Sequence, residues 1–131
     1  MNLLLDTHVW LWSQLAPERL SRRARARLSA ADTALWLSPV SVWELLLLCE
    51  RGRLRLVPGP RAWVDSFFAK VPVRDAPLTR EVALLSRSIE VEHQDPADRF
   101  LAATAATFDL TLVTADEPLL RGKGYRVLSA R

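Results

Sequence analysis

The sequence contains little cysteine and lysine and no long apolar run, and each shortage excludes something. Among its 131 residues only Cys49 is a cysteine, so no disulfide can form within the chain, and a reducing cytoplasm is the expected compartment. Apolar runs such as those at 3–5 and 45–48 are far too short to span a bilayer. No charged segment precedes a long apolar stretch, so we expect neither a signal peptide nor membrane association.

Lysine occurs only at Lys70 and Lys123, and arginine therefore carries nearly all of the positive charge. Lysine and arginine together number 18 against 15 aspartates and glutamates, which gives a net charge of +3. The arginines concentrate at 19–27 and 51–55. Guanidinium forks match phosphate oxygens, so these clusters indicate either a polyanion site or a solvated basic face. The candidates for phosphate contact are Arg22, Arg23, Arg25, Arg51 and Arg53.

Hydrophobic spacing and turn residues predict strands that alternate with helices. The expected strands are 2–5, 34–37, 71–73, 110–114 and 125–128. The expected helices are 7–16, 18–31, 39–52, 61–70, 79–89 and 99–108, with a loop at 53–60 and a short helix or turn at 115–120. Such alternation implies parallel pairing. We therefore predict a three-layer α/β/α sandwich with a central, mostly parallel sheet, formed by a single domain over residues 1–131.

Several carboxylates follow the predicted strands. Asp6 comes directly after the first strand, and Asp116 lies just beyond the fourth. Asp95 and Asp98 open the alanine-rich helix, and Glu44 lies inside the helix that follows the second strand. Ligands of parallel sheets bind at the carboxyl ends of the strands, so these acids can converge on one edge of the sheet.

Some of these acids also have an ordinary structural explanation. Either Asp6 or Thr7 could cap the first helix. Asp95 stands before Pro96 and makes a good helix cap, while the helix dipole favours the charge of Asp98 in the same first turn. Capping therefore competes with a functional role at these positions.

Capping explains Glu44 and Asp116 less well. Thr114 and Glu117 have the spacing of a capping box, which leaves Asp116 unexplained. Ser38 precedes a proline and is the better cap of its helix, which puts Glu44 in the second turn among apolar neighbours. An ionised carboxylate in such surroundings is costly to desolvate unless it is paired or bound to a metal.

Taken together, the acids favour a metal site. Carboxylates gathered at one edge would repel and raise one another's pKa values, and a hard cation such as Mg²⁺ removes that penalty. No Cys/His spacing indicates zinc, and we expect His8 and His93 to be ordinary polar residues or supports of the ligands. Acids with a divalent cation, beside arginines that hold flanking phosphates, suit phosphodiester hydrolysis.

The sequence resembles, in order and over essentially the whole chain, the PIN-domain ribonucleases and among them the VapC-like toxins of type II toxin–antitoxin systems. The similar segments are "LLLDTHVWLW", "LSPVSVWELLLL", "HQDPADRFLAATA", "LTLVTADEPL" and "YRVL". The resemblance implies an endoribonuclease that depends on Mg²⁺ or Mn²⁺. Its implied metal ligands and catalytic acids are Asp6, Glu44, Asp98 and Asp116.

Within this resemblance Asp98 is assigned to the metal, and Asp95 to capping or to supporting the ligands. Thr7, Ser38 and Thr114 flank the acids and could orient them or a water. Members of the family usually dimerise and are neutralised by a partner protein. A homodimer and a cognate antitoxin are therefore the expected partners, beside an RNA substrate.

The chain departs from the family pattern at one place. Related sequences often carry a lysine one turn after the helix acid, where this chain has "LLC" at 47–49. A rim contact to RNA or antitoxin is then lost.

Trp10 and Trp12 lie two residues apart and cannot share one helix face, so one of them is a candidate for an interface.

Two alternatives stay open from the sequence. One is a PIN-type nuclease that processes RNA outside a toxin–antitoxin pair. The other is a catalytically dead module that binds RNA or protein, although the intact set of acids argues against it. A phosphoryl-transfer domain of the receiver or haloacid-dehalogenase kind is disfavoured, because neither Lys70 nor Lys123 stands where its lysine is needed.

Overall fold

Five parallel strands form one sheet in the order β3-β2-β1-β4-β5. The computed structural model describes residues 1–131. The strands are β1 Asn2–Leu5, β2 Ala34–Leu37, β3 Val73–Asp75, β4 Thr111–Thr114 and β5 Arg126–Ser129. All four strand pairs are parallel, as the alternation of strands and helices predicts.

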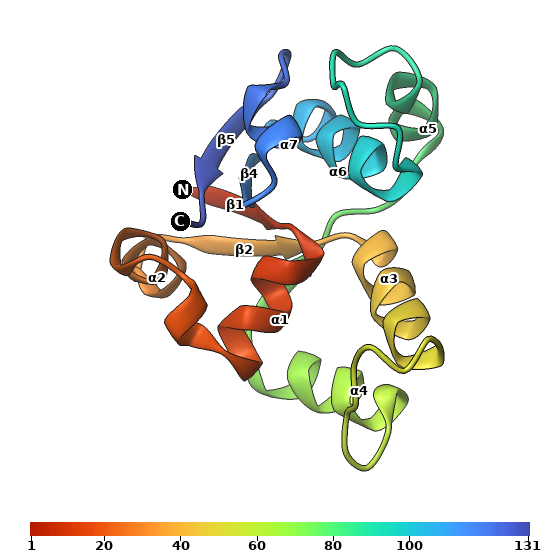
Figure 1. Ribbon diagram of the computed structural model, residues 1–131. Helices are drawn as coiled ribbons and strands as arrows, with labels where there is room; N and C mark the ends of the chain where they lie inside the picture. The colour runs from red at the N-terminus through yellow and green to blue at the C-terminus, as the bar shows by residue number, and fades with distance from the viewer.

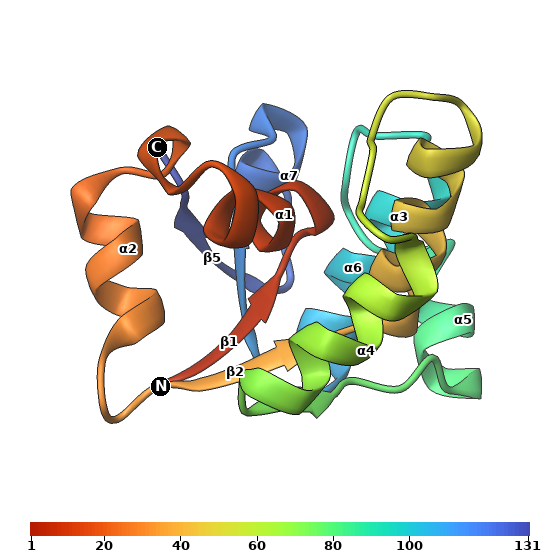
Figure 2. The same ribbon diagram turned by 90° about the horizontal axis from the view of Figure 1, so that it is seen from below.

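Seven α-helices and one short 3₁₀-helix connect the strands. They are α1 Thr7–Leu15, η1 Pro17–Arg19, α2 Arg22–Ser29, α3 Pro39–Glu50, α4 Pro60–Lys70, α5 Arg80–Ser86, α6 Pro96–Thr107 and α7 Glu117–Arg121. Figures 1 and 2 show α1, α2 and α4 on one side of the sheet and α5, α6 and α7 on the other. Helix α3 contacts α1, α4 and α6. The predicted α/β/α sandwich is confirmed.

The leucines of β1 pack into the hydrophobic core on both faces of the sheet. Leu3 and Leu5 pack in a cluster with Trp10 of α1 and Phe67 of α4. Leu4 points the opposite way and joins a second cluster with residues of α6 and α7. Successive side chains of a strand alternate between faces, and a central strand covered on both faces reads as an unbroken apolar run. The "LLL" stretch is therefore buried throughout.

The single helix expected over 18–31 is wrong. The chain breaks between η1 and α2, where Leu20 has an extended backbone and is 3% exposed within the core. The hydroxyl of Ser21 accepts a hydrogen bond from the backbone N–H of Ala24 and so caps a new helix. Burial of Leu20 and this cap together favour two short helices over one long one.

Smaller differences occur at the ends of elements. The third strand spans 73–75 rather than 71–73, and β5 ends at Ser129 rather than at 128. Helix α5 ends at Ser86 rather than at 89, and α6 begins at Pro96 rather than at 99. None of these shifts moves an acid away from the carboxyl ends of the strands. None of the helices combines the length and the apolar composition that a bilayer span requires.

The strand order creates a crevice at one end of the sheet. From β1 the chain moves outward through β2 to β3, then returns to the other side of β1 for β4 and β5. The order thus reverses between β1 and β4, and in open α/β sheets ligands bind outside the carboxyl ends of the strands at such a point. Asp6 directly follows β1, and Ala115 and Asp116 directly follow β4.

Candidate metal centre

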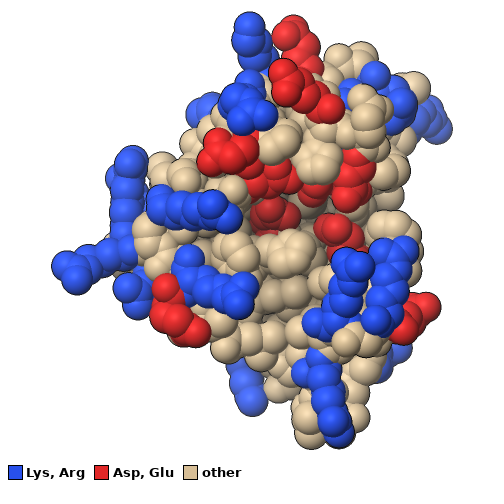
Figure 3. Space-filling view, viewed as in Figure 1, with Lys and Arg blue, Asp and Glu red and all other residues tan.

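An acidic pocket of about 300 Å³ opens at the carboxyl ends of β1 and β4. The acids that line it are Asp6, Glu44, Asp95, Asp98 and Asp116. Figure 3 shows carboxylates gathered in the middle of this face, with lysine and arginine side chains on either side of them. The chain therefore brings the four predicted ligands together, and Asp95 lies beside them.

Asp6 lies at the floor of the pocket and is 6% exposed. Its side chain makes no capping hydrogen bond to α1, so the capping explanation does not hold for it. The hydroxyl of Thr114 instead donates to Oδ2 of Asp6 at 2.6 Å. Burial raises the pKa of Asp6 despite this bond, because desolvation disfavours the charged form.

Glu44 reaches the pocket from α3 and is held by α1. The hydroxyl of Thr7 donates to Oε1 of Glu44 at 2.5 Å, and it is also hydrogen-bonded to the hydroxyl of Ser41 at 2.9 Å. Thr7 is the first residue of α1 and does not cap it, so its expected use as a cap is wrong. Burial raises the pKa of Glu44, the Thr7 hydrogen bond opposes that shift, and the charge of Asp6 adds to it.

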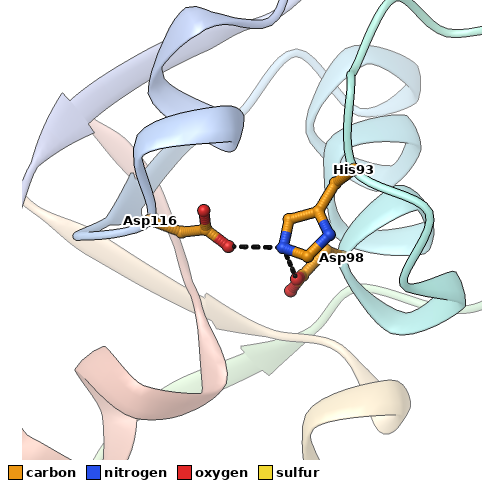
Figure 4. Close-up of side chains that lie close together, drawn as sticks. All are labelled: His93, Asp98 and Asp116. Carbon is orange, nitrogen blue, oxygen red and sulfur yellow. Dashed lines mark hydrogen bonds and ion pairs between the residues drawn. The ribbon is translucent and has the colours of Figure 1, made fainter.

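Asp98 and Asp116 both approach the same nitrogen of the His93 imidazole (Figure 4). Nε2 of His93 lies 2.9 Å from Oδ2 of Asp98 and 2.9 Å from Oδ2 of Asp116. One ligand atom from each of the three residues lies within 4.8 Å of the others, which is close enough for a shared metal ion. The backbone N–H of Asp95 approaches Nδ1 of His93 at 3.4 Å, which favours the tautomer with the proton on Nε2.

Burial and the crowding of carboxylates both shape the electrostatics of the acidic pocket. The pKa of Asp98 is raised to about 8, first by burial and then by the charges of Asp6, Asp95, Glu44 and Asp116. Like charges in a desolvated site disfavour ionisation of one another. A divalent cation among these oxygens would relieve both the burial and the repulsion, so the donor set fits a hard metal ion.

Two further side chains, one half-buried and one buried, support this geometry. The sequence left His93 as either an ordinary polar residue or a support of the ligands, and its contacts with two of the acids favour the second. The sequence feature that points to this role is the position of His93 in the turn before Asp98. The second group is Arg99, which was not singled out although it directly follows Asp98.

Arg99 is 7% exposed and ties down the loop between α5 and α6. Its Nε donates to the carbonyl of Ser86 at 2.7 Å. Its two terminal nitrogens donate to the carbonyls of Ile89 at 2.9 Å, Val91 at 2.7 Å and His93 at 3.1 Å. This guanidinium satisfies four backbone oxygens, and one of them is the carbonyl of Ser86, the residue at which α5 ends.

Replacing Arg99 by methionine is expected to cost about 3 kcal/mol of unfolding free energy, because several buried carbonyls lose their only charged donor. Arg99→Lys should cost less but remain destabilising, since one ammonium cannot span the same fork of acceptors. Urea unfolding measures both. Arg80→Met, at an exposed site on α5, is the matched control. Equal stability of the Arg99 and Arg80 variants would contradict this role.

The remaining predicted residues divide between capping and surface roles. Asp95 caps α6 by accepting from the N–H of Ala97 at 2.9 Å, and Ser38 caps α3 by accepting from the N–H of Val40 at 3.1 Å. Thr114 does not form a capping box, because its hydroxyl accepts from the N–H of Asp116 and donates to Asp6. Thr114 thus links the acids that follow β1 and β4.

The predicted arginines lie exposed in two places. Arg22, Arg23 and Arg25 lie on α2, whereas Arg51 and Arg53 follow the end of α3. Of these five only Arg51 lines a surface depression that contains Glu44. Arg51 therefore supplies a cation two helical turns beyond Glu44, although the family's lysine is missing.

The two tryptophans of α1 have separate environments. Trp10 is fully buried and packs its ring 5.6 Å from Trp63 and 5.4 Å from Phe67. Trp12 is partly exposed, lines the acidic pocket and lies 5.8 Å below the guanidinium of Arg19. Of this pair, Trp12 is the one available to a partner.

The fold and the site together define a class of protein. The sheet is parallel, and a cluster of carboxylates lies where its strand order reverses. These features define an α/β domain whose carboxylate oxygens can bind a metal ion. The chain belongs to the PIN domain family, which it matches over residues 3–124.

A relative and several solved structures resemble the chain along most of its length. It is 34% identical over 119 residues to ribonuclease VapC22 of Mycobacterium tuberculosis strain ATCC 25618 / H37Rv, covering 90% of this chain and 89% of the relative. The structure of VapBC2 from Rickettsia felis bound to a promoter DNA fragment has a TM-score of 0.73 at 14% identity, with both chains covered completely. FitAcB from Neisseria gonorrhoeae has a TM-score of 0.64 at 22% identity, with 96% of each chain covered. VapBC-5 from M. tuberculosis, of the VapBC family of toxin–antitoxin systems, has a TM-score of 0.59 at 16% identity and covers 99% of this chain and 98% of its own. These solved structures establish that the fold is shared.

Proposed function

We propose that this protein is a metal-dependent endoribonuclease that acts as the toxin of a type II toxin–antitoxin pair. The observation that carries the proposal is the acidic pocket at the switch point of the sheet, in a chain of the PIN domain family. The 34% identity to a protein named ribonuclease VapC22 supports RNA as the substrate. The fold shared with a protein of the VapBC family of toxin–antitoxin systems supports the toxin role.

The proposed cofactor is Mg²⁺ or Mn²⁺, held by Asp6, Glu44, Asp98 and Asp116. Their carboxylate oxygens are the donors that hard cations prefer. When bound, such an ion activates a water and stabilises the negative charge on the phosphoryl group and the leaving oxygen. Burial, together with the neighbouring carboxylates, raises the pKa of Asp98 to about 8 and makes the site costly to keep charged without an ion.

The hydroxyls beside the acids are proposed to keep the carboxylates aimed into the pocket. Thr114 holds one oxygen of Asp6, and Thr7 holds one oxygen of Glu44. Each hydroxyl fixes a rotamer, so the acid loses less conformational freedom when it acts as a ligand. His93 is proposed to hold the carboxylates of Asp98 and Asp116 near each other, because its Nε2 atom contacts both. Ser38 acts indirectly by holding the start of the helix that carries Glu44.

Replacing Thr7 by valine is expected to lower RNA cleavage about 10- to 100-fold, the usual cost of losing a group that orients a metal ligand. Valine matches the shape of threonine but cannot donate to Glu44. Thr7→Ser keeps the hydroxyl and should retain most activity. Steady-state cleavage of a labelled RNA and the metal dissociation constant from calorimetry measure the effect. Equal activity in the valine and serine variants would exclude an orienting role.

The partners proposed for the protein follow from the same role. Exposed arginines, namely Arg22, Arg23, Arg25, Arg51 and Arg53, are proposed to bind phosphates that flank the cleaved bond. A cognate antitoxin is proposed to cover the site, and a homodimer is the proposed assembly. With RNA and antitoxin as partners, we propose that the protein acts in the cytoplasm.

The test is cleavage of total cellular RNA by the purified protein with Mg²⁺, with Mn²⁺ and with chelator alone. Cleavage is expected with either metal and should stop when chelator is added. Sequencing of the new RNA ends identifies the target. Cleavage that continues in chelator, or no cleavage with either metal, would contradict the proposal.

The toxin role needs a second measurement, because a processing nuclease would also cut RNA. Expression of the parent should arrest growth, and co-expression of the neighbouring reading frame should restore it. An RNA cut without growth arrest would favour a processing nuclease.

A further inference from the structure

Trp43 is an exposed aromatic residue beside one of the proposed metal ligands. It directly precedes Glu44 on α3 and is 53% exposed, whereas Trp10 is fully buried in the core. A large apolar side chain that is exposed to solvent contributes little to the stability of the core. An exposed tryptophan next to a functional carboxylate therefore points to a ligand rather than to packing.

A groove of about 410 Å³ runs from Trp43 to the acidic pocket, and we refer to it as the aromatic groove. Its apolar walls are Trp43, Leu47 and Leu48 of α3 with Pro96 and Ala97 of α6. Residues His8, Glu44 and Asp95 line both the groove and the pocket, so the two hollows adjoin each other. A molecule that occupies the groove therefore reaches the carboxylates.

The charges along the groove describe its occupant. Arg51 lines the groove as its cation, and Glu44 and Asp95 line it where it adjoins the acidic pocket. An occupant that complements both must present a flat apolar surface to the indole and a negative group to the arginine. It must also carry a second negative group that a metal ion can bind. A nucleotide within a single strand of RNA has all three.

We propose that the aromatic groove binds one unpaired base of the RNA substrate, stacked on Trp43 next to the phosphate that is cleaved, with Arg51 on a flanking phosphate. This inference rests on the proposed ribonuclease function and adds a subsite to it. A base within a duplex is stacked on its neighbours and cannot enter the groove. The subsite therefore selects single-stranded RNA, and it tolerates different bases because every base has a flat aromatic face.

The test compares Trp43→Ala and Trp43→Phe with Leu46→Ala. Leu46 is 37% exposed on the same helix but does not line the groove, which makes it a matched control. Each substitution is combined with Asp98→Asn, so that RNA binds without being cut. The probe is a single-stranded RNA oligonucleotide of about ten nucleotides and its duplex form. Because Trp43 is exposed, its variants should unfold at the same temperature as the parent.

Trp43→Ala is expected to weaken single-strand binding by about 5- to 150-fold, the cost of losing one stacked base. Trp43→Phe should retain most of the affinity, Leu46→Ala all of it, and duplex binding should change little in any variant. Quenching of tryptophan fluorescence by the oligonucleotide should shrink in Trp43→Phe. In the uncombined variants, cleavage of single-stranded RNA should fall in the same order.

Failure of the inference and failure of the proposed ribonuclease function give different results. If the parent cuts RNA and the Trp43 variants bind and cut as it does, the inference is wrong while the ribonuclease function stands. If no RNA is cut with any metal, the proposed function fails. Binding that is equal in Trp43→Ala and the parent then overturns the inference separately. Loss of neutralisation by an antitoxin, or a changed dimer, with unchanged RNA binding would assign the groove to a protein and overturn it as well.

Discussion

Asp98→Asn is expected to lower RNA cleavage at least about 1000-fold while making the metal-free protein more stable. The activity is lost because a bound metal ion lowers the activation free energy of the reaction by several kcal/mol, and each 1.4 kcal/mol changes the rate about tenfold. The stability rises because asparagine removes a carboxylate that burial and four neighbouring acids disfavour. At pH 8 in chelator the midpoint of thermal unfolding should increase by about 4 °C or more.

Asp65→Asn provides the control for both readouts. Asp65 is exposed on α4 and pairs only with Arg61, far along the chain from the acidic pocket. Its variant should cut RNA and unfold as the parent does. Cleavage by Asp98→Asn at the parent's rate would remove Asp98 from the ligand set. An inactive but less stable Asp98→Asn variant would mean that the side chain serves packing rather than the metal.

The metal-free protein is expected to lose stability as the pH rises from about 4 to about 8. The pKa of Asp98 is raised to about 8 in the folded protein from a usual value of 3.8, and the pKa values of Asp6 and Glu44 are raised too. Between these limits the folded state holds a proton that the unfolded state has released. Asp98 alone therefore lowers the stability by about 1.4 kcal/mol for each pH unit in this range, Asp6 and Glu44 act in the same direction, and stability is greatest at the acidic end.

Bound metal should reverse this trend. Mg²⁺ or Mn²⁺ binds the ionised carboxylates and the folded state only, so its stabilising effect grows as the pH rises. Thermal unfolding between pH 5 and 8, with chelator and with each metal, measures both slopes. Asp98→Asn should flatten the slope seen in chelator. The same slope in that variant and in the parent would show that other groups control it.

Much of the candidate site follows from short-range features of the sequence. The run of leucines before Asp6 marks a buried central strand, and the acid after it falls at the strand's carboxyl end. Pro39 and Pro96 each stand at the first position of a helix, which puts Glu44 and Asp98 within its first two turns. Alternation of strands and helices then implies a parallel sheet, and a parallel sheet brings such ends together.

Other contacts involve residues distant in the sequence, and no local pattern announces them. Thr7 has a helix-start position that suits capping, yet its hydroxyl is taken by Glu44, which is 37 positions away in the chain. Thr114 reaches Asp6 over 108 positions. Arg99 looks like one more basic residue, but it is buried among carbonyls of a loop. Trp43 reads as one of several core aromatics, yet it is the most exposed of the tryptophans described above.

The sequence by itself determined the layers, the parallel sheet and the identity of the acids, because strand and helix periodicity and capping are set by neighbours along the chain. Only the tertiary structure decided which groups hold those acids and which face the solvent. His93 contacts both Asp98 and Asp116, and Arg99 holds the loop that carries it through the carbonyl of His93. Trp43 is exposed because the buried face of α3 is formed by other residues of that helix. Both outcomes depend on how separate elements pack, and packing is a property of the whole fold rather than of any segment.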